Sequence, residues 1–200
     1  MKNFGLYCIT DNRNNPISII KIWIKLGVPM IQFRNKEMDN KEFADMAWEI
    51  RKLTWGTKSK FIINDRIEIA KDVDADGLHL GQEDLKNIDY DLKNLRKYLL
   101  GQNTRLGKEK IIGLSSHSFD QAKETAKLEP DYLSIGPFFT TPTKPTYTPI
   151  GFTTVKKVVE EIKNIPIVTI GGINSKNLKE VLKTGIKNVA MVREVNENID

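Results

Sequence analysis

Short apolar runs alternate along the chain with longer segments in which apolar residues recur every three or four positions. The apolar runs predict eight buried strands, at 4–9, 29–33, 60–63, 76–80, 110–114, 131–135, 166–170 and 188–192. The segments between them predict helices near 16–26, 40–54, 66–72, 89–100, 118–128, 151–163 and 174–184. The polar stretch 101–109 predicts a surface loop, and the residues after Val192 are too few for a full final helix.

The strict alternation of strand and helix indicates an α/β fold. Nearly every strand run is apolar throughout, which is typical of a parallel sheet with both faces covered by helices. A doubly wound sheet of five or six strands would leave some of these runs without a place. Eight βα units predict instead a closed (β/α)₈ TIM barrel, and because no Pro-, Gly- or Ser-rich linker divides the chain, we expect one domain over residues 1–200.

Composition narrows the class of protein. Hydrophobic residues make up 40% of the chain and charged residues 28%, which is an ordinary globular balance. No apolar run approaches the roughly 20 residues that a membrane-spanning helix needs. The first residues, MKNFGLYCIT, lead directly into a strand pattern without the apolar segment of a secretory signal. We therefore expect a cytoplasmic protein with no membrane partner.

The net charge of +5 raises the question of a nucleic-acid partner. Most lysines stand singly or in pairs among acidic residues in the helical segments, and blocks of five or six like charges are absent from the sequence. Solvated helix faces explain this distribution better, so we expect no nucleic-acid binding. Cys8, His79 and His117 are too few to form a zinc site of Cys and His ligands, so any metal must be held by oxygen.

A barrel places its functional residues at the carboxyl ends of its strands and in the loops that follow them. Asp65 and Asp84 follow the third and fourth strand runs, with Asn64 beside them. Each aspartate taken singly is explained well as a helix cap. As a pair near basic residues they are better explained as ligands of Mg²⁺, which prefers oxygen donors and takes the rest of its shell from water and substrate phosphate.

Basic residues follow two other strand runs. Arg34 and Lys36 leave the second run, and Lys144 follows the sixth run in the threonine-rich segment 136–144. Surface solubility is the alternative for any one of them, but three cations in strand-end loops indicate a cradle for an anion such as phosphate.

A second anion site is indicated after the seventh run. Gly171 and Gly172 lead into a predicted helix capped by Asn174 or Ser175, and backbone N–H groups at such a place favour phosphate. A tight turn is the alternative. Two anion sites on one rim predict two phosphorylated substrates, or one substrate with phosphate at both ends.

Six segments, in their order and spacing, resemble the motifs of the thiamine-phosphate synthase family. They are QFRNK at 32–36, IINDR at 62–66, DGLHLGQED at 76–84, GLSSHS at 113–118, GPFFTTPTKP at 136–145 and IGGIN at 170–174. The resemblance implies a (β/α)₈ barrel transferase that joins 4-amino-2-methyl-5-(diphosphooxymethyl)pyrimidine to a thiazole phosphate, giving thiamine phosphate and pyrophosphate.

The resemblance also implies which residues form the site. The residues expected to bind the pyrimidine diphosphate are Gln32, Phe33, Arg34, Asn35, Lys36, Asn64, Ser115 and Lys144. Those expected to bind the thiazole phosphate are Thr141, Pro142, Thr143, Gly172, Val192 and Arg193. The expected Mg²⁺ ligands are Asp65 and Asp84, and the expected catalytic residues are Arg34, Lys36, Ser115 and Lys144.

The implied reaction is loss of pyrophosphate followed by capture of the pyrimidine methylene cation by the thiazole nitrogen. The protein must then stabilise the leaving group and align the nucleophile. A Ser115 and His117 nucleophile–base pair is the alternative chemistry, but i, i+2 spacing at a strand end does not establish contact, so structural or orienting roles are favoured.

Two residues depart from the family pattern. Asn35 stands where the family commonly has Glu, and Arg193 stands where it commonly has Ser; we hypothesise that Arg193 adds a phosphate contact. The rival functions are thiazole tautomerase, a related barrel, and a non-catalytic thiamine-pathway binding protein. Retention of Lys36, Asp65 and Asp84 favours the synthase. The sequence leaves open the carboxylated or decarboxylated thiazole, and a monomer or a homo-oligomer.

Overall fold

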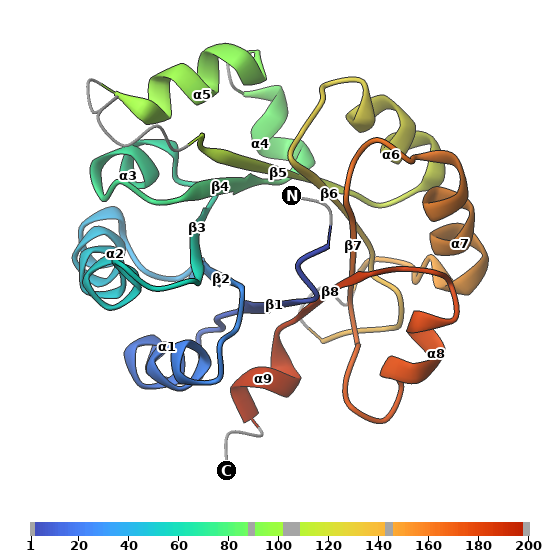
Figure 1. Ribbon diagram of the computed structural model, residues 1–200, viewed down its shortest axis with the longest axis horizontal. Coiled ribbons are helices and arrows are strands. Elements are labelled where there is room, and N and C mark those ends of the chain that lie inside the picture. Colours follow the sequence, from blue (N-terminus) through green and yellow to red (C-terminus); the bar gives the residue numbers. More distant parts are fainter. Residues whose placement is uncertain (1–2, 88–90, 102–108, 143–145, 198–200) are drawn as a thin grey trace.

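In the computed structural model, which describes residues 3–87, 91–101, 109–142 and 146–197, eight parallel strands pair in chain order and β8 closes on β1 (Figure 1). The predicted TIM barrel is confirmed. The strands are β1 (Leu6–Ile9), β2 (Met30–Phe33), β3 (Lys60–Asn64), β4 (Gly77–Leu80), β5 (Ile111–Ser116), β6 (Tyr132–Ile135), β7 (Ile167–Ile170) and β8 (Asn188–Met191).

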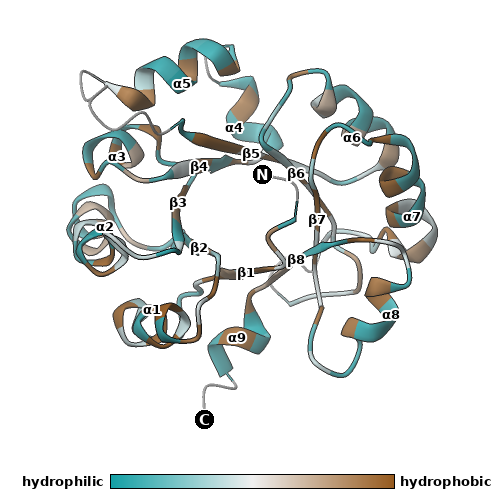
Figure 2. Cartoon of the chain, in the orientation of Figure 1, coloured by the Kyte–Doolittle hydropathy of each residue, from teal (hydrophilic) through white to brown (hydrophobic). Residues whose placement is uncertain are grey.

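Helices surround this ring of strands (Figure 1). They are α1 (Pro16–Lys25), α2 (Asn40–Thr54), α3 (Ile67–Asp72), α4 (Gln82–Lys86), α5 (Leu92–Leu100), α6 (Phe119–Ala126), α7 (Gly151–Glu161), α8 (Leu178–Leu182) and α9 (Arg193–Glu197). Figure 2 shows hydrophobic and hydrophilic residues side by side on these helices, as expected for helices with one buried face. In the described part of the chain no helix is long and apolar enough to cross a bilayer.

The helix predicted at 174–184 is shorter, and α8 begins only at Leu178. Asn174 Oδ1 accepts a hydrogen bond from Asn177 N (3.2 Å), and Asn177 Oδ1 accepts one from Asn174 N (2.9 Å). This reciprocal pair has the arrangement of a capping box, and Leu178 N donates to Asn174 O (3.0 Å), so Asn174 caps the turn that leads into α8. The helix itself begins later than predicted.

Two short helices lie beyond strand ends. The sequence pattern did not predict α4, which begins after Gly81; Gly81 N donates to Asp84 Oδ2 (3.1 Å), so an aspartate in the first turn supports this start. The other is α9, which covers Arg193–Glu197 and is the last helix of the described residues. The loop predicted at 101–109 falls mostly on residues 102–108, outside the described residues.

Strand side chains alternate between two packed layers. Outward-facing residues such as Ile31, Phe33 and Leu78 are buried against the helices. The inward-facing residues form a separate cluster inside the barrel, which consists of Tyr7, Ile9, Met30, Ile62, Tyr132, Val168 and Ala190. The barrel is therefore filled from within and is not a pore.

Charged side chains tie neighbouring strands together at their amino ends. Asp76, just before β4, accepts hydrogen bonds from Phe61 N of β3 (2.9 Å) and from Arg51 Nη1 of α2 (3.1 Å). Asp131, just before β6, accepts one from Ile112 N of β5 (2.7 Å). The charged side chains at the amino ends of the strands thus stabilise the fold. The carboxyl ends of the strands are where a TIM barrel places its functional residues.

Candidate active site

A cavity of about 440 Å³ opens at the carboxyl ends of the strands. Residues at or just beyond the ends of all eight strands line it, from Ile9 on β1 to Val192 after β8. The predicted site residues that line the cavity are Gln32, Arg34, Lys36, Asn64, Asp65, Asp84, Ser115, Thr141, Pro142, Gly172, Val192 and Arg193. The fold thus gathers most of the predicted site from distant parts of the chain.

Two residues of the predicted segment 32–36 do not line the cavity. Phe33 faces the helices and stacks on Phe43, with ring centroids 4.2 Å apart, because neighbouring residues of a strand point to opposite faces. Asn35 Oδ1 accepts hydrogen bonds from Glu37 N and Met38 N (both 2.9 Å) and so shapes the turn after β2. The buried Phe33 side chain therefore cannot contact a ligand in the cavity, whereas the predicted contact of Asn35 stays a prediction.

The loop after β6 carries the predicted threonines. Phe138 N donates to Ile170 O (2.8 Å), which holds the start of this loop against the end of β7. Thr141 lines the cavity from there. Thr143 and Lys144 lie outside the described residues, so their phosphate contacts stay predictions.

The two aspartates face each other across the ends of β3 and β4. Asp65 has φ 61 and donates its N–H to His79 O (2.9 Å), which fixes it beside β4. Burial raises the pKa of the Asp65 carboxyl, and the nearby negative charge of Asp84 raises it further. Lys36 Nζ, 3.5 Å from Asp65 Oδ2, acts in the opposite direction. A partly buried pair of like charges favours a bound cation.

The chemistry of this pair fits Mg²⁺. Both donors are carboxylate oxygens, and Lys36 supplies a positive charge beside them. Among the described residues no cluster of three or more His, Cys, Asp or Glu side chains could hold a metal. Two carboxylates would therefore leave most coordination positions to water and a substrate phosphate, as Mg²⁺ prefers.

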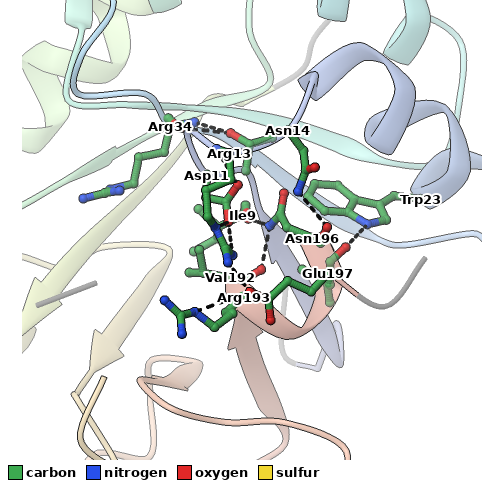
Figure 3. Close-up of polar contacts among 12 residues, drawn as sticks. Ile9, Asp11, Arg13, Asn14, Trp23, Arg34, Val192, Arg193, Asn196 and Glu197 are labelled. Atoms are coloured by element: carbon green, nitrogen blue, oxygen red, sulfur yellow. Dashed lines mark hydrogen bonds and ion pairs between the residues drawn. The ribbon is translucent and has the colours of Figure 1, made fainter. Parts of the chain in front are cut away.

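Arg34 is held by its backbone so that its side chain can reach away from the barrel wall. Arg34 N donates to Thr10 Oγ1 (2.9 Å), and Thr10 Oγ1 donates to Arg34 O (3.0 Å), so the end of β1 fixes the residue twice. Burial lowers the pKa of the guanidinium and Asp65 opposes this effect; an arginine remains charged in either case. Figure 3 shows the guanidinium directed away from the α9 contacts.

Short helix α9 is tied to the end of β1 (Figure 3). Asn196 Nδ2 donates to Ile9 O (2.8 Å) and to Val192 O (2.6 Å), and Asn14 Nδ2 donates to Asn196 O (2.8 Å). Trp23 Nε1 donates to Val195 O (3.2 Å). The carbonyl groups at the end of the helix are thus satisfied, and its first residues face the cavity.

A row of alternating charges runs from the β1 loop to Arg193 (Figure 3). Asp11 pairs with Arg13, Arg13 pairs with Glu197, and Arg193 Nε lies 3.7 Å from Glu197 Oε1. Sequence reasoning missed Asp11, Arg13 and Glu197, since 184 positions separate the last two and no local motif links them. The ion pair with Glu197 orients the Arg193 side chain through its Nε atom.

Gly172 allows a close approach to the backbone after β7. The residue has φ 65, and a Cβ there would come within 2.8 Å of Thr140 O and of Phe139 Cβ. Asn177 Nδ2 donates to Gly172 O (2.8 Å) and fixes the turn. The glycine is thus required by the fold of this turn as well as by any ligand that approaches it.

Ser115 contacts a different histidine from the one its sequence neighbourhood suggests. Ser115 Oγ lies 2.9 Å from His79 Nε2 on the adjacent strand β4. His117 Nδ1 instead lies 2.9 Å from Gly136 O, and its ring packs against Tyr147. The structural or orienting roles favoured for Ser115 and His117 therefore stay predictions, and the contact between His79 and Ser115 was not predicted.

A (β/α)₈ barrel with paired carboxylates, cations and a glycine turn around one mouth belongs to the class of enzymes that act on phosphorylated ligands. The family model described as thiamine monophosphate synthase matches residues 6–195. The chain belongs to this family.

Known relatives resemble the chain over nearly its whole length. A thiamine-phosphate synthase of Syntrophomonas wolfei is 38% identical over 195 residues, covering 95% of this chain and 87% of the relative. One from Clostridium acetobutylicum is 35% identical over 198 residues, covering 96% and 88%. The solved structure of a thiamine phosphate pyrophosphorylase from Pyrococcus furiosus has a TM-score of 0.78 and 32% identity, covering 98% and 92%.

Proposed function

We propose that the protein joins 4-amino-2-methyl-5-(diphosphooxymethyl)pyrimidine to 4-methyl-5-(2-phosphoethyl)thiazole, giving thiamine phosphate and pyrophosphate. With the 2-carboxy form of the thiazole the products are thiamine phosphate, pyrophosphate and carbon dioxide. The observation that carries this proposal is that one cavity is lined on two sides by groups suited to anions. Arg34, Lys36 and the aspartate pair lie at the ends of β2 to β4, whereas Gly172 and Arg193 lie after β7 and β8.

The first side suits the pyrimidine diphosphate. Asp65 and Asp84 would hold Mg²⁺, which would neutralise negative charge on the departing pyrophosphate. Arg34 binds phosphate oxygens through its planar fork, and Lys36 adds a point charge. Lys144 is proposed as a further contact from outside the described residues.

The chemistry requires one bond to break and one to form. The bond between the pyrimidine methylene carbon and the diphosphate oxygen breaks, both electrons leave with pyrophosphate, and the thiazole nitrogen supplies the pair for the new carbon–nitrogen bond. Because the amino group of the pyrimidine shares the positive charge, no protein nucleophile is needed. Arg34 and Lys36 stabilise the leaving group, while the shape of the cavity aligns the two rings.

The second side is proposed to hold the phosphate of the thiazole. Thr141, Pro142 and Gly172 come from the loops after β6 and β7, and Val192 and Arg193 come from the end of β8. Small phosphorylated substrates account for the cations around the cavity, so we also propose a cytoplasmic enzyme without a nucleic-acid partner.

Pyrophosphate release tests this function. We expect release only when both substrates and Mg²⁺ are present, and omission of any one should reduce it to background. If the folded protein bound thiazole phosphate but never released pyrophosphate, the reaction proposed here would be wrong, and a tautomerase or a binding protein would fit better.

A further inference from the structure

A chain of hydrogen bonds crosses the inside of the barrel between β2 and β5, two strands of the same ring (Figure 1). Gln32 Nε2 donates to Tyr7 Oη (2.6 Å), and Tyr7 Oη lies 2.8 Å from Tyr132 Oη. His79 continues the chain, with Nδ1 2.9 Å from Tyr132 Oη and Nε2 2.9 Å from Ser115 Oγ. Both end residues, Gln32 and Ser115, line the cavity, and so do Tyr7 and His79.

The surroundings hold the middle of this chain in place. Tyr7 and Tyr132 are 1% and 0% exposed, and the Phe4 ring packs edge-on against both. His79 stacks on Tyr132 with ring centroids 5.6 Å apart. Gly113 is required, because a Cβ there would overlap the Tyr132 ring. The geometry is thus built into the barrel interior.

Both tyrosines keep their protons. Burial raises the pKa of the Tyr7 hydroxyl and raises that of Tyr132 well above its ordinary value. Two phenolic protons must therefore each find an acceptor, and the protons of the chain can be assigned by counting donors.

The number of donors and acceptors favours one direction of hydrogen-bond donation along the chain. Tyr7 Oη already accepts from Gln32 Nε2, so if Tyr132 also donated to it, the buried Tyr7 proton would have no acceptor among the described residues. An unused buried donor is costly. Tyr7 therefore donates to Tyr132, Tyr132 donates to His79 Nδ1, and His79 Nε2–H donates to Ser115 Oγ.

We propose that Tyr7, Tyr132 and His79 are positioning residues that decide which hydrogen-bonding groups the cavity presents to its ligand. Gln32 Nε2 gives one of its two N–H groups to Tyr7, which fixes the plane of the amide, and the Gln32 oxygen remains an acceptor for a ligand in the cavity. Ser115 accepts from His79, so Ser115 offers its own proton, a donor. The two ends are set together, because reversing the chain would exchange the roles of both.

This pattern matches an amino-substituted ring that bears a phosphate, and to that extent the inference rests on the proposed function. An amide oxygen held at the amino group would stabilise the positive charge that spreads onto it as pyrophosphate leaves. Ser115 would donate to an acceptor on the same substrate. The substrate contacts are assigned to Gln32 and Ser115. Tyr7 and His79 also line the cavity, whereas Tyr132 is fully buried behind them.

The ring tautomer of His79 tests the direction without any substrate. The chain has two histidines, so ¹⁵N NMR spectra of the ligand-free protein can be assigned with a His117→Gln variant. We expect His79 as the Nε2–H tautomer in the wild type and in Tyr7→Phe, and loss of this single tautomer in Tyr132→Phe. An Nδ1–H tautomer in the wild type, or an unchanged one in Tyr132→Phe, would overturn the proposal.

Steady-state kinetics with both substrates distinguish a positioning role of Tyr132 from a purely structural one. Tyr132→Phe should lower kcat/KM for the pyrimidine diphosphate about tenfold, while KM for the thiazole phosphate changes less than about twofold. Tyr98→Phe removes a hydroxyl bonded to Glu68 on the outside of the barrel and should change neither. Equal losses for both substrates, with a lower unfolding temperature, would indicate a structural role and contradict the proposal.

The two hypotheses fail separately. If the wild type released no pyrophosphate but His79 showed the expected tautomers, the proposed function would be wrong and the hydrogen-bond chain would stand. If turnover were normal in Tyr132→Phe, the chain would have no positioning role and the proposed function would stand.

Discussion

The negative charge of Asp65 is proposed to bind a cation, and without that cation it lowers the stability of the folded protein. Its carboxyl is partly buried and lies beside Asp84, and both features raise its pKa. The ionised form is therefore less stable in the folded protein than in the unfolded chain. Lys36 offsets only part of this effect. Such a site gains most from a bound cation.

We predict that Asp65→Asn stabilises the metal-free protein at neutral pH. Because the folded pKa is raised, the stability linked to Asp65 is fully present below the unfolded value, about 3.9, and is lost as pH rises through the folded value. Asn removes that loss, so the gain in unfolding free energy should appear near pH 7 and vanish at low pH. Turnover should fall at least about a hundredfold.

Chemical unfolding at several pH values, with and without Mg²⁺, checks this prediction. Mg²⁺ should raise the stability of the wild type and leave the variant unchanged, because a ligand stabilises only the state that binds it. A variant that is less stable than the wild type at pH 7, or near-normal in turnover, would show that Asp65 does not have this role.

A substitution of Arg193 tests whether its side of the cavity binds the thiazole phosphate. Arg193→Ser should raise KM for the thiazole phosphate about fivefold to tenfold and leave KM for the pyrimidine diphosphate unchanged, because it removes a cation from one side of the cavity only. Lys187→Ser removes an exposed charge just before β8, at the opposite end of the barrel, and serves as the control. An unchanged or improved KM for the thiazole phosphate in Arg193→Ser would contradict the proposed contact.

At the scale of elements, the strands could be predicted well because both their faces are buried. An apolar run such as 166–170 has no polar face to obscure it, and β7 indeed covers Ile167–Ile170. The short helix α4 and the start of α8 could not be predicted, since both depend on side chains that bind the backbone locally, at Asp84 and Asn177. Apolar periodicity carries no information on such contacts.

The strand connections at the amino ends should matter for stability and not for activity. Asp76→Ala should lower the free energy of unfolding by about 2–4 kcal/mol, because it leaves Phe61 N and the buried Arg51 guanidinium without this acceptor. Arg51 keeps Asp74, 3.6 Å away. Urea unfolding measures the loss.

An exposed ion pair provides the matched control. Asp45 pairs with Lys41 on α2, and both side chains are largely exposed, so Asp45→Ala should cost less than about 1 kcal/mol. Equal losses for Asp45→Ala and Asp76→Ala would show that Asp76 does not join the strands as described.

At the scale of the whole molecule, the closed barrel explains why much of the site was predictable. Closure brings all strand ends to one mouth, so polar residues after separate strands, such as Arg34, Asp65 and Ser115, must meet. Contacts inside the barrel could not be predicted in this way. Tyr7 and Tyr132 lie in apolar runs and are indeed core residues, but only the structure shows that their hydroxyl groups meet.

The two ends of the barrel have different roles. The amino ends of the strands hold paired charges that join β3 to β4 and β5 to β6, and the carboxyl ends hold charges that face one cavity. We propose that the two sides of this cavity bind two phosphorylated substrates that react with each other.

Product stoichiometry tests that claim most directly. Thiamine phosphate and pyrophosphate are measured in one reaction mixture that contains both substrates, Mg²⁺ and the wild-type protein. We expect the two products to appear together in equimolar amounts, and neither to appear in multiple turnovers when either substrate is left out. Binding of both substrates by the folded protein without formation of either product would contradict it.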